Sequence, residues 1–322
     1  MKLTAVIFSV IFILLSCEKE PLEISNSTTK KQYALTDLFK NLAPPMQNFT
    51  ITAGQYQIIK GEKGTVIGFQ ANSFKRKNGT ILASGSVKII LQEILTGPEM
   101  ILANRTTTSN GKLLISGGQI LVKAFLGNEE LIVNKNAKPE VRIPTNNLKP
   151  MDLYAGNLIT DDSIVGDTTI NWDITKDSVI IIDSAGRGGA GGTTTWPSGY
   201  GFFMDSFRYW NCDQLYDNTT PRTELYIKLP IGFDNINTGV FIYFTSINSV
   251  AKCEGFEPSS KTFFLNHAEA SVGLAIKILS ISKKDNKIYY DLKSSTVTSG
   301  FNTTMDPTEI SETALKALIK TL

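Results

Sequence analysis

The stretch Gly85-Ser86-Val87-Lys88-Ile89-Ile90-Leu91-Gln92-Glu93 decides the fold of this 322-residue chain. Val87, Ile89 and Leu91 occupy every second position, and mostly polar side chains lie between them. Because successive side chains of a strand point to opposite faces, this alternation predicts a strand that buries one face. Similar short runs recur from Phe49 to about Pro144. The first half of the chain is therefore expected to be built from strands.

Turn-forming residues separate these runs at short intervals. Asn78-Gly79 and Asn110-Gly111 are the clearest hairpin turns, since Asn and Gly accept the positive φ that tight turns need. Short strands at this spacing are typical of a β-sandwich. We expect an all-β protein with two β-sandwich-like domains and short flanking helices.

A longer pattern links these glycines to the alternating positions. It consists of Gly61-x-x-Gly64-Thr65, Phe69-x-x-Asn72-x-Phe74, Asn78-Gly79, Gly85-x-Val87-x-Ile89-x-Leu91-x-Glu93, Met100-Ile101, Thr108-x-x-Gly111-x-Leu113-Leu114 and Ser116-Gly117-Gly118. The pattern resembles a module of outer-surface bacterial lipoproteins, which is in turn similar to the β-sandwich of ankyrins and netrin receptors. Trp210-Asn211-Cys212-Asp213 and Phe233-Asp234-Asn235-Ile236-Asn237-Thr238 also resemble that lipoprotein family. The resemblance implies a sandwich that acts as a scaffold for other proteins. Some eukaryotic relatives cut themselves at a His-Phe-Ser step, but this chain lacks that tripeptide.

The N-terminal residues resemble a bacterial lipoprotein signal. Lys2 precedes an almost wholly apolar run from Leu3 to Leu15, which is too short for the roughly 20 residues of a membrane-spanning helix. Leu14-Leu15-Ser16-Cys17 then resembles a lipobox, which implies cleavage before Cys17, acylation of its sulfur and anchoring in a membrane by acyl chains. The alternatives are an ordinary secretory signal and an uncleaved anchor. A polar cluster at residues 18–20 favours the outer membrane or the cell surface, with a periplasm-facing location left open.

The sequence as a whole divides the chain into five parts. Residues 1–17 are the expected signal peptide, 18–48 a tether with a short helix, and 49–183 the N-terminal sandwich. Residues 184–199 form a glycine-rich linker, and 200–322 a C-terminal β-rich domain. That domain is expected to end in a helix, because apolar residues at helical spacing follow Ser311, which can cap the first turn.

An aromatic run near residue 200 has two interpretations. Aromatic side chains favour pleated surfaces, so the run fits the core of a sandwich. It could instead form an exposed flat platform for sugar rings, made by Trp196, Tyr200, Phe202, Tyr209 and Trp210. The two interpretations differ in whether these side chains are buried.

The cysteines leave a similar choice. If Cys17 is acylated, Cys212 and Cys253 form an even pair in an exported protein. A disulfide between them is one alternative, and two buried free thiols are the other.

No familiar catalytic arrangement occurs in the sequence. His267 is the one histidine, which excludes metal sites with two or three histidines, and no serine-hydrolase elbow or zinc-protease motif is present. We expect no cofactor and no metal site. A formal net charge of +2, from 32 basic and 30 acidic side chains, gives no basic stripe for nucleic acid.

Two functions follow from these patterns. The first is a non-enzymatic lipid-anchored surface or outer-membrane lipoprotein that binds an unidentified protein or polysaccharide through its loops. The alternative is a glycan-binding or glycan-processing lipoprotein.

Overall fold

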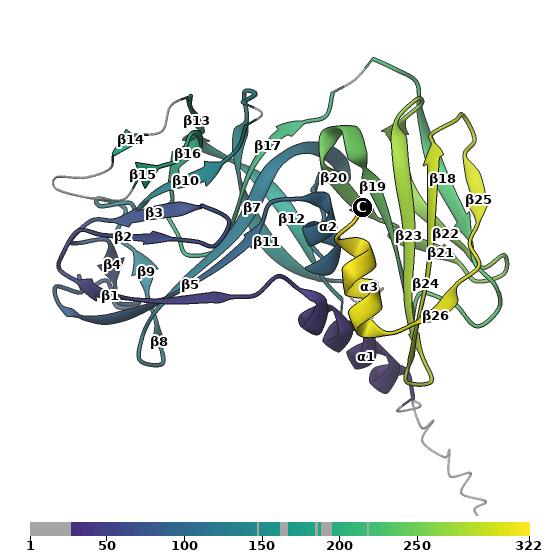
Figure 1. Cartoon of the computed structure of the whole chain (residues 1–322), viewed down its shortest axis with the longest axis horizontal. Helices are drawn as coiled ribbons and strands as arrows, with labels where there is room; N and C mark the ends of the chain where they lie inside the picture. The colour runs from purple at the N-terminus through teal and green to yellow at the C-terminus, as the bar shows by residue number, and fades with distance from the viewer. Residues whose placement is uncertain (1–26, 147, 162–166, 184–185, 188–194, 218) are drawn as a thin grey trace, which may run out of the picture.

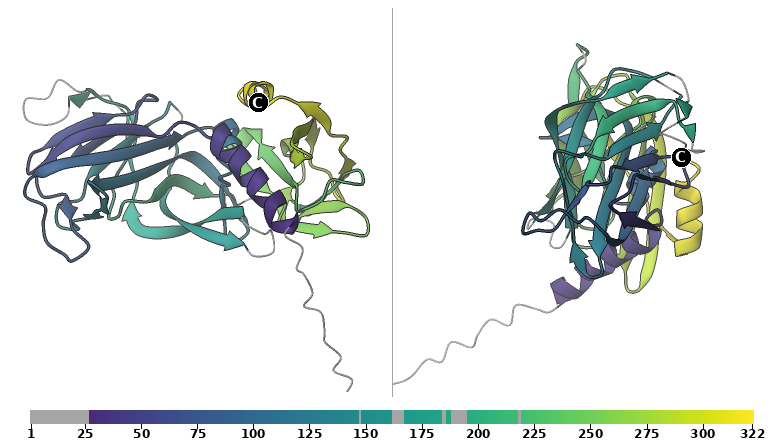
Figure 2. Two further views of the ribbon diagram at one scale, coloured as in Figure 1. Left: turned by 90° about the horizontal axis from the view of Figure 1, so that it is seen from below. Right: turned by 90° about the vertical axis from the view of Figure 1, so that its left-hand side faces the viewer.

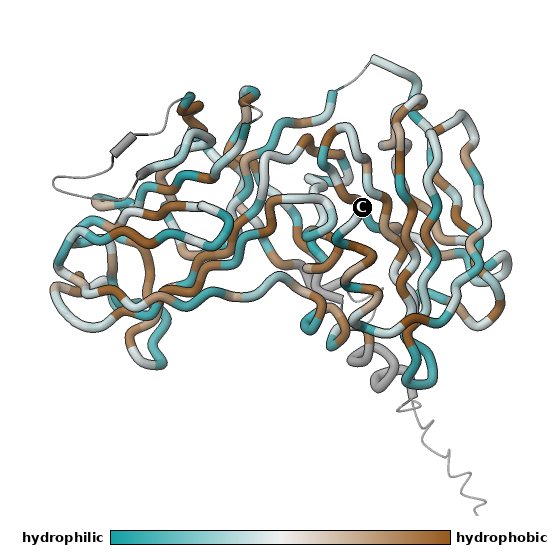
Figure 3. Tube along the Cα trace, in the orientation of Figure 1, coloured by the Kyte–Doolittle hydropathy of each residue, from teal (hydrophilic) through white to brown (hydrophobic). Residues whose placement is uncertain are grey.

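The computed structural model describes residues 27–146, 148–161, 167–183, 186–187, 195–217 and 219–322. These residues form two β-sandwiches side by side, with helices where the sandwiches meet (Figure 1). The predicted all-β class with short flanking helices is confirmed. Figure 3 shows apolar and polar residues interleaved along many of the strands.

The first sandwich has one large sheet and one small one. The large sheet has the order β1 (Gln47–Ala53), β5 (Gly85–Ile94), β7 (Lys112–Leu126), β17 (Tyr209–Leu215), β11 (Asp152–Asp161) and β12 (Asp167–Ser178), with β6 (Thr108–Ser109) and β8 (Glu129–Glu130) also paired to β7. The facing sheet has the order β13 (Ile180–Ile182), β16 (Gly199–Phe203), β10 (Glu140–Pro144), β3 (Val66–Phe69) and β2 (Gln57–Lys60). Two short ladders pair β4 (Phe74–Lys75) with β9 (Ile132–Val133) and β14 (Gly186–Arg187) with β15 (Thr195–Trp196).

The second sandwich packs two smaller sheets. One has the order β21 (Gly255–Glu257), β22 (Thr262–Ser271), β18 (Arg222–Lys228) and β25 (Asn302–Thr304). The other has the order β20 (Ser249–Lys252), β19 (Thr238–Phe244), β23 (Ala275–Lys284), β24 (Lys287–Thr296) and β26 (Thr308–Ile310). The β18–β25 pair is parallel, and the other named pairs in the described chain are antiparallel.

Three α-helices occur in the described residues: α1 (Ser27–Leu42), α2 (Gly97–Leu102) and α3 (Glu312–Ile319). The predicted terminal helix is present, and the Ser311 hydroxyl accepts a hydrogen bond from the Ala314 N–H at 3.2 Å, which caps its first turn. Helix α1 lies within residues 18–48, the segment in which a tether with a short helix was expected. None of the described helices has the length and apolar character needed to cross a membrane.

The opening stretch forms β5, and its alternation is observed. Val87, Ile89 and Leu91 are fully buried between the two sheets of the first sandwich. The alternation of buried and less buried residues ends at Leu91, and the next three residues, Gln92, Glu93 and Ile94, are all buried. Both faces of this part of the strand are therefore covered.

The buried Glu93 explains part of the glycine pattern. Its carboxylate accepts hydrogen bonds from the backbone N–H groups of Lys63 and Thr65, each at 2.9 Å, and from Gln47 Nε2 at 2.8 Å. A Cβ at Gly61 would lie 2.5 Å from that carboxylate, so the turn can approach it only with glycine there. Residues 61–65 and the end of β5 are thus one local structure.

The two sandwiches share an apolar core. Phe39 and Leu42 of α1, Trp172 of the first sandwich and Phe241 of the second belong to a single buried cluster. Asn248 adds a polar link, since its Nδ2 donates to the carbonyls of Leu95 and Ser116, and its Oδ1 accepts from the Gly97 N–H at 2.8 Å. Each sandwich also has its own apolar core.

The position of the domain boundary differs from the expectation. The chain was expected to enter its second domain at residue 200, but β16 pairs with β10, and β17 lies between β7 and β11 in the first sandwich. The described parts of the expected 184–199 linker include the β14–β15 ladder. The chain crosses to the second sandwich between Leu215 and Arg222. Strand alternation identifies a strand but not its partner, which is why the boundary was misplaced.

Candidate functional site

Of the two interpretations of the aromatic run, the exposed platform is not observed. Trp196, Tyr200, Phe202, Tyr209 and Trp210 are all buried. Tyr200, Phe202 and Trp210 face the core of the first sandwich, whereas Tyr209 faces the core shared by the two sandwiches. The prediction of a sugar platform from these residues is therefore wrong, and the core interpretation holds. Strand β17 is covered on both faces, so its neighbouring aromatic residues are all internal.

The two cysteines are free, buried thiols. Cys212 lies in the core of the first sandwich and Cys253 in that of the second, so the disulfide alternative does not apply. Burial raises the pKa of both thiols well above the ordinary value, which keeps them protonated and unreactive at neutral pH.

Two residues that the sequence singled out are not described. Cys17, the predicted lipidation site, lies outside the described residues. The backbone of His267 lies within β22, but its side chain is outside the description.

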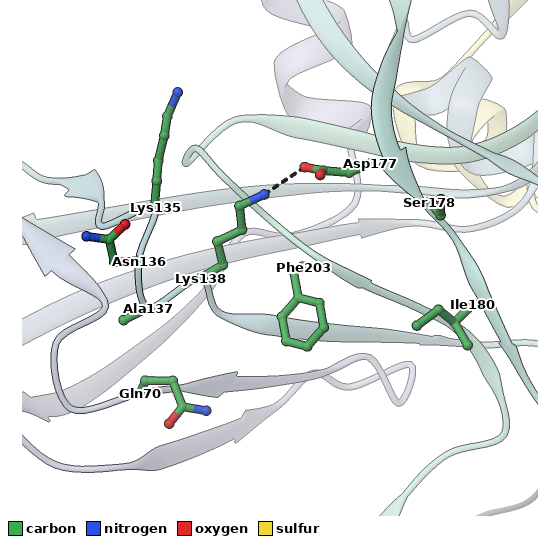
Figure 4. A pocket seen from close by; sticks show the side chains of 9 residues that line it. All are labelled: Gln70, Lys135, Asn136, Ala137, Lys138, Asp177, Ser178, Ile180 and Phe203. Atoms are coloured by element: carbon green, nitrogen blue, oxygen red, sulfur yellow. Dashed lines mark hydrogen bonds and ion pairs between the residues drawn. The ribbon is translucent and has the colours of Figure 1, made fainter.

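An open pocket of about 540 Å³ lies on the first sandwich (Figure 4). Its lining comes from four separate parts of the chain, which are the segment after β3, the β9–β10 loop, the β12–β13 junction and the end of β16. The lining residues are Gln70, Lys135, Asn136, Ala137, Lys138, Asp177, Ser178, Ile180 and Phe203.

Apolar side chains occupy the middle of this pocket. Phe203 is 46% exposed and Ile180 is 55% exposed, although both lie in strands. The preceding residue, Phe202, points the other way and packs near Trp210, with 5.9 Å between ring centroids. Strand β16 therefore presents one phenyl ring to the core and the next to the pocket.

Polar groups surround these two apolar side chains. Lys138 Nζ lies 2.9 Å from Asp177 Oδ2 and closes one side with an ion pair, and the amides of Gln70 and Asn136 lie on the other side (Figure 4). Lys135 extends away from the ring toward solvent. The pocket thus combines one aromatic face with amide, ammonium and carboxylate groups.

The β9–β10 loop, which carries four of the lining residues, is held in place by hydrogen bonds. The Ser73 hydroxyl donates to the carbonyl of Ala137 at 2.8 Å, and Asn134 Nδ2 donates to the carbonyl of Asn72 at 2.9 Å. The Asn134 N–H also donates to the carbonyl of Ser73 at 2.8 Å. The pocket wall is therefore already formed without a ligand, as is common for binding sites.

Among the described residues that line the pocket, Asp177 is the one carboxylate, and Lys138 engages it. Across the described part of the chain, no group of three or more His, Cys, Asp and Glu side chains could hold a metal ion. The chemistry available in the pocket is stacking, hydrogen bonding and ion pairing.

A buried carboxylate, that of Asp213, lies away from the pocket, at a β-bulge or irregularity where the register between β17 and β7 shifts. Asp213 is fully buried, Asn211 Nδ2 donates to its Oδ2 at 2.6 Å, and its Oδ1 has no hydrogen-bond partner. Desolvation raises the pKa of Asp213 well above its ordinary value, and nearby donors on Ser116 and Gly117 oppose that rise only in part. Asp213 is therefore a buried group of the first sandwich and does not belong to the pocket.

Sequence reasoning did not identify Phe203 or its neighbours. The adjacent pair Phe202-Phe203 was a usable clue, because only one of two consecutive strand residues can face a given core. The other lining residues are ordinary polar side chains whose proximity depends on the packing of distant strands. Comparison with protein-family models, curated proteins and solved structures gives no match to this chain.

Proposed function

We propose that this protein is a non-enzymatic, lipid-anchored binding protein of the outer membrane or cell surface. The observation that carries the proposal is Leu14-Leu15-Ser16-Cys17, which follows a short apolar run and precedes polar residues. Only nine residues separate Cys17 from Ser27, where α1 begins. Acyl chains on Cys17 would hold both sandwiches close to the membrane surface.

The anchor is tested by Cys17→Ser in the producing bacterium. We expect the native protein to partition with membranes and its N-terminal peptide to carry acyl mass on Cys17. The Cys17→Ser protein should lose that mass and leave the membrane fraction, while its far-UV circular dichroism stays that of a β protein. Unchanged membrane partitioning of the variant would refute lipid anchoring.

The pocket supports a second, more specific function, which is binding of a saccharide. Phe203 offers an exposed aromatic face, on which the apolar face of a sugar ring can stack. The amides of Gln70 and Asn136 and the Lys138–Asp177 pair supply donors and acceptors for hydroxyl groups around that ring. This arrangement replaces the buried platform as the support for glycan binding.

A glycan array probed with the chain from residue 18 onward tests this function. Binding should be lost in Phe203→Ala and retained in Tyr226→Ala, a matched control in which a part-exposed aromatic ring of the second sandwich is removed. If the two variants bind the same glycans equally well, the pocket is not the binding site.

A further inference from the structure

The β18–β19 loop, residues 230–237, exposes an unusual apolar side chain. Ile231 is 88% exposed, which is the highest value among the large hydrophobic residues that the structure describes. Ile236 in the same loop is 37% exposed, and Pro230 and Phe233 are partly buried. Exposed apolar residues gathered on one loop are typical of contact surfaces.

The loop holds Ile231 outward through its own hydrogen bonds. Asn237 Nδ2 donates to the carbonyl of Gly232 at 2.9 Å, and the Asp234 N–H donates to Asn237 Oδ1 at 3.1 Å. The Phe233 ring meets Tyr289 edge-on, with 5.5 Å between centroids, and Lys284 Nζ lies 5.7 Å from the centroid of the same ring. The exposure of Ile231 therefore belongs to an ordered loop.

This loop lies at the end of the molecule where α1 begins. The Lys283 N–H donates to the carbonyl of Asn237 at 2.9 Å, so the loop rests against the β23–β24 hairpin. In Figure 1 and in the right-hand view of Figure 2, the tip of that hairpin and the N-terminal end of α1 both lie at the bottom of the molecule. Nine residues lie between Cys17 and Ser27, and the ten Cα-to-Cα steps that join the two span at most about 35 Å when fully extended.

From this placement we propose that the β18–β19 loop rests on the membrane that holds the lipid anchor, with Ile231 inserted among the lipid headgroups. This inference depends on the proposed lipid anchor. A short tether makes the contact intramolecular and raises the effective concentration of lipid at the loop, so one small apolar loop suffices.

The charges near the loop indicate which lipids take part. Lys283, Lys284 and Lys287 are on the hairpin side, and Asp234, Asp285 and Glu309 lie among them; Lys287 is paired with Glu309 at 2.7 Å. Because the two signs balance, the contact depends on apolar insertion and not on anionic lipid. Neutral and mildly anionic vesicles should therefore give the same result.

A tryptophan at the loop tip tests this contact directly. Trp172, Trp196 and Trp210 are all buried, so they form a shielded background. We would place the full lipidated chain carrying Ile231→Trp on vesicles whose acyl chains bear bromine near the headgroups. We expect brominated lipid to quench the fluorescence that the introduced tryptophan adds. The emission maximum of that fluorescence should also lie at shorter wavelength than in the double variant Ile231→Trp, Cys17→Ser, which stays in solution.

Ile180→Trp is the matched control. Ile180 is 55% exposed but belongs to the pocket of the first sandwich, so its emission should be unaffected by brominated lipid. Equal quenching of both variants, or no quenching of Ile231→Trp, would overturn the membrane contact while leaving the anchor intact. Failure of the anchor itself would appear separately, as unchanged membrane partitioning of Cys17→Ser.

Discussion

The two sandwiches place their charged groups differently. Within the described residues, both buried carboxylates, Glu93 and Asp213, belong to the first sandwich. Among the same residues, the second sandwich buries one ammonium group, that of Lys252, and several hydroxyl side chains, among them Thr238 and Ser282, whose hydroxyls are hydrogen-bonded at 2.8 Å. The first sandwich therefore fixes a turn and a bulge with buried carboxylates, whereas the buried polar groups of the second are mostly hydroxyls. Because the two sandwiches also share a core, the question is whether they unfold in one transition or in two.

The largest expected effect comes from the second core. Phe244 is fully buried there, and Phe244→Ala should lower the free energy of unfolding by about 3–5 kcal/mol. All three tryptophans lie in strands of the first sandwich, and Trp172 is also part of the core that the two sandwiches share, so tryptophan fluorescence reports on the first sandwich and on the shared core. Because the cores are joined through α1, α2 and α3, we expect fluorescence and far-UV circular dichroism to shift together in urea.

An unshifted fluorescence midpoint in Phe244→Ala, beside an earlier transition by circular dichroism, would contradict this coupling. The two sandwiches would then unfold as separate units.

Substitution of Glu93 tests how much a buried carboxylate stabilises the first sandwich. Glu93→Ala removes the acceptor for the backbone N–H groups of Lys63 and Thr65 and leaves them without that partner. Because each such group costs about 1–3 kcal/mol, we expect a loss of about 3 kcal/mol in urea denaturation. Glu93→Gln keeps the side-chain volume and one acceptor oxygen and should lose less; equal losses in the two variants would show that the remaining acceptor oxygen contributes nothing and that the charged carboxylate is required.

Strand alternation explains how much of this could be anticipated. The alternation of Val87, Ile89 and Leu91 correctly predicted the buried face of β5. An apolar residue at every second position indicates both that the segment is a strand and which of its two faces is buried. The burial of Glu93 was not predicted, since it depends on a turn about 30 residues earlier. For the same reason, the sequence could not show that Phe203 and Lys138 line one pocket.

Asp213 should make the first sandwich sensitive to pH. Its pKa is raised in the folded protein, so the native state binds a proton more tightly than the unfolded chain does. Stability from this group is fully present below the ordinary Asp value of 3.8 and is lost as pH rises toward the folded-state pKa. Asn at this position carries no charge to bury, so Asp213→Asn should be more stable than the native chain at pH 7 when each is compared with its own stability at pH 4.

The measurement is the free energy of unfolding between pH 4 and pH 8, for the native chain and Asp213→Asn. The variant should show a weaker decline with rising pH, and the two curves should converge at the acid end. Parallel curves would mean that Asp213 does not carry the pH dependence.

The smallest effect on stability is expected at Phe203, and it distinguishes a pocket residue from a core residue. Phe202 and Phe203 are neighbours in β16, but one ring is 1% exposed and the other 46%. Phe202→Ala should cost about 3–5 kcal/mol because it leaves a cavity between the sheets. Phe203→Ala removes a ring that water already reaches, so the expected change in urea denaturation is within about 1 kcal/mol. A large loss at Phe203 would mean that its ring supports the β9–β10 loop, and loss of glycan binding in that variant would then no longer locate the binding site.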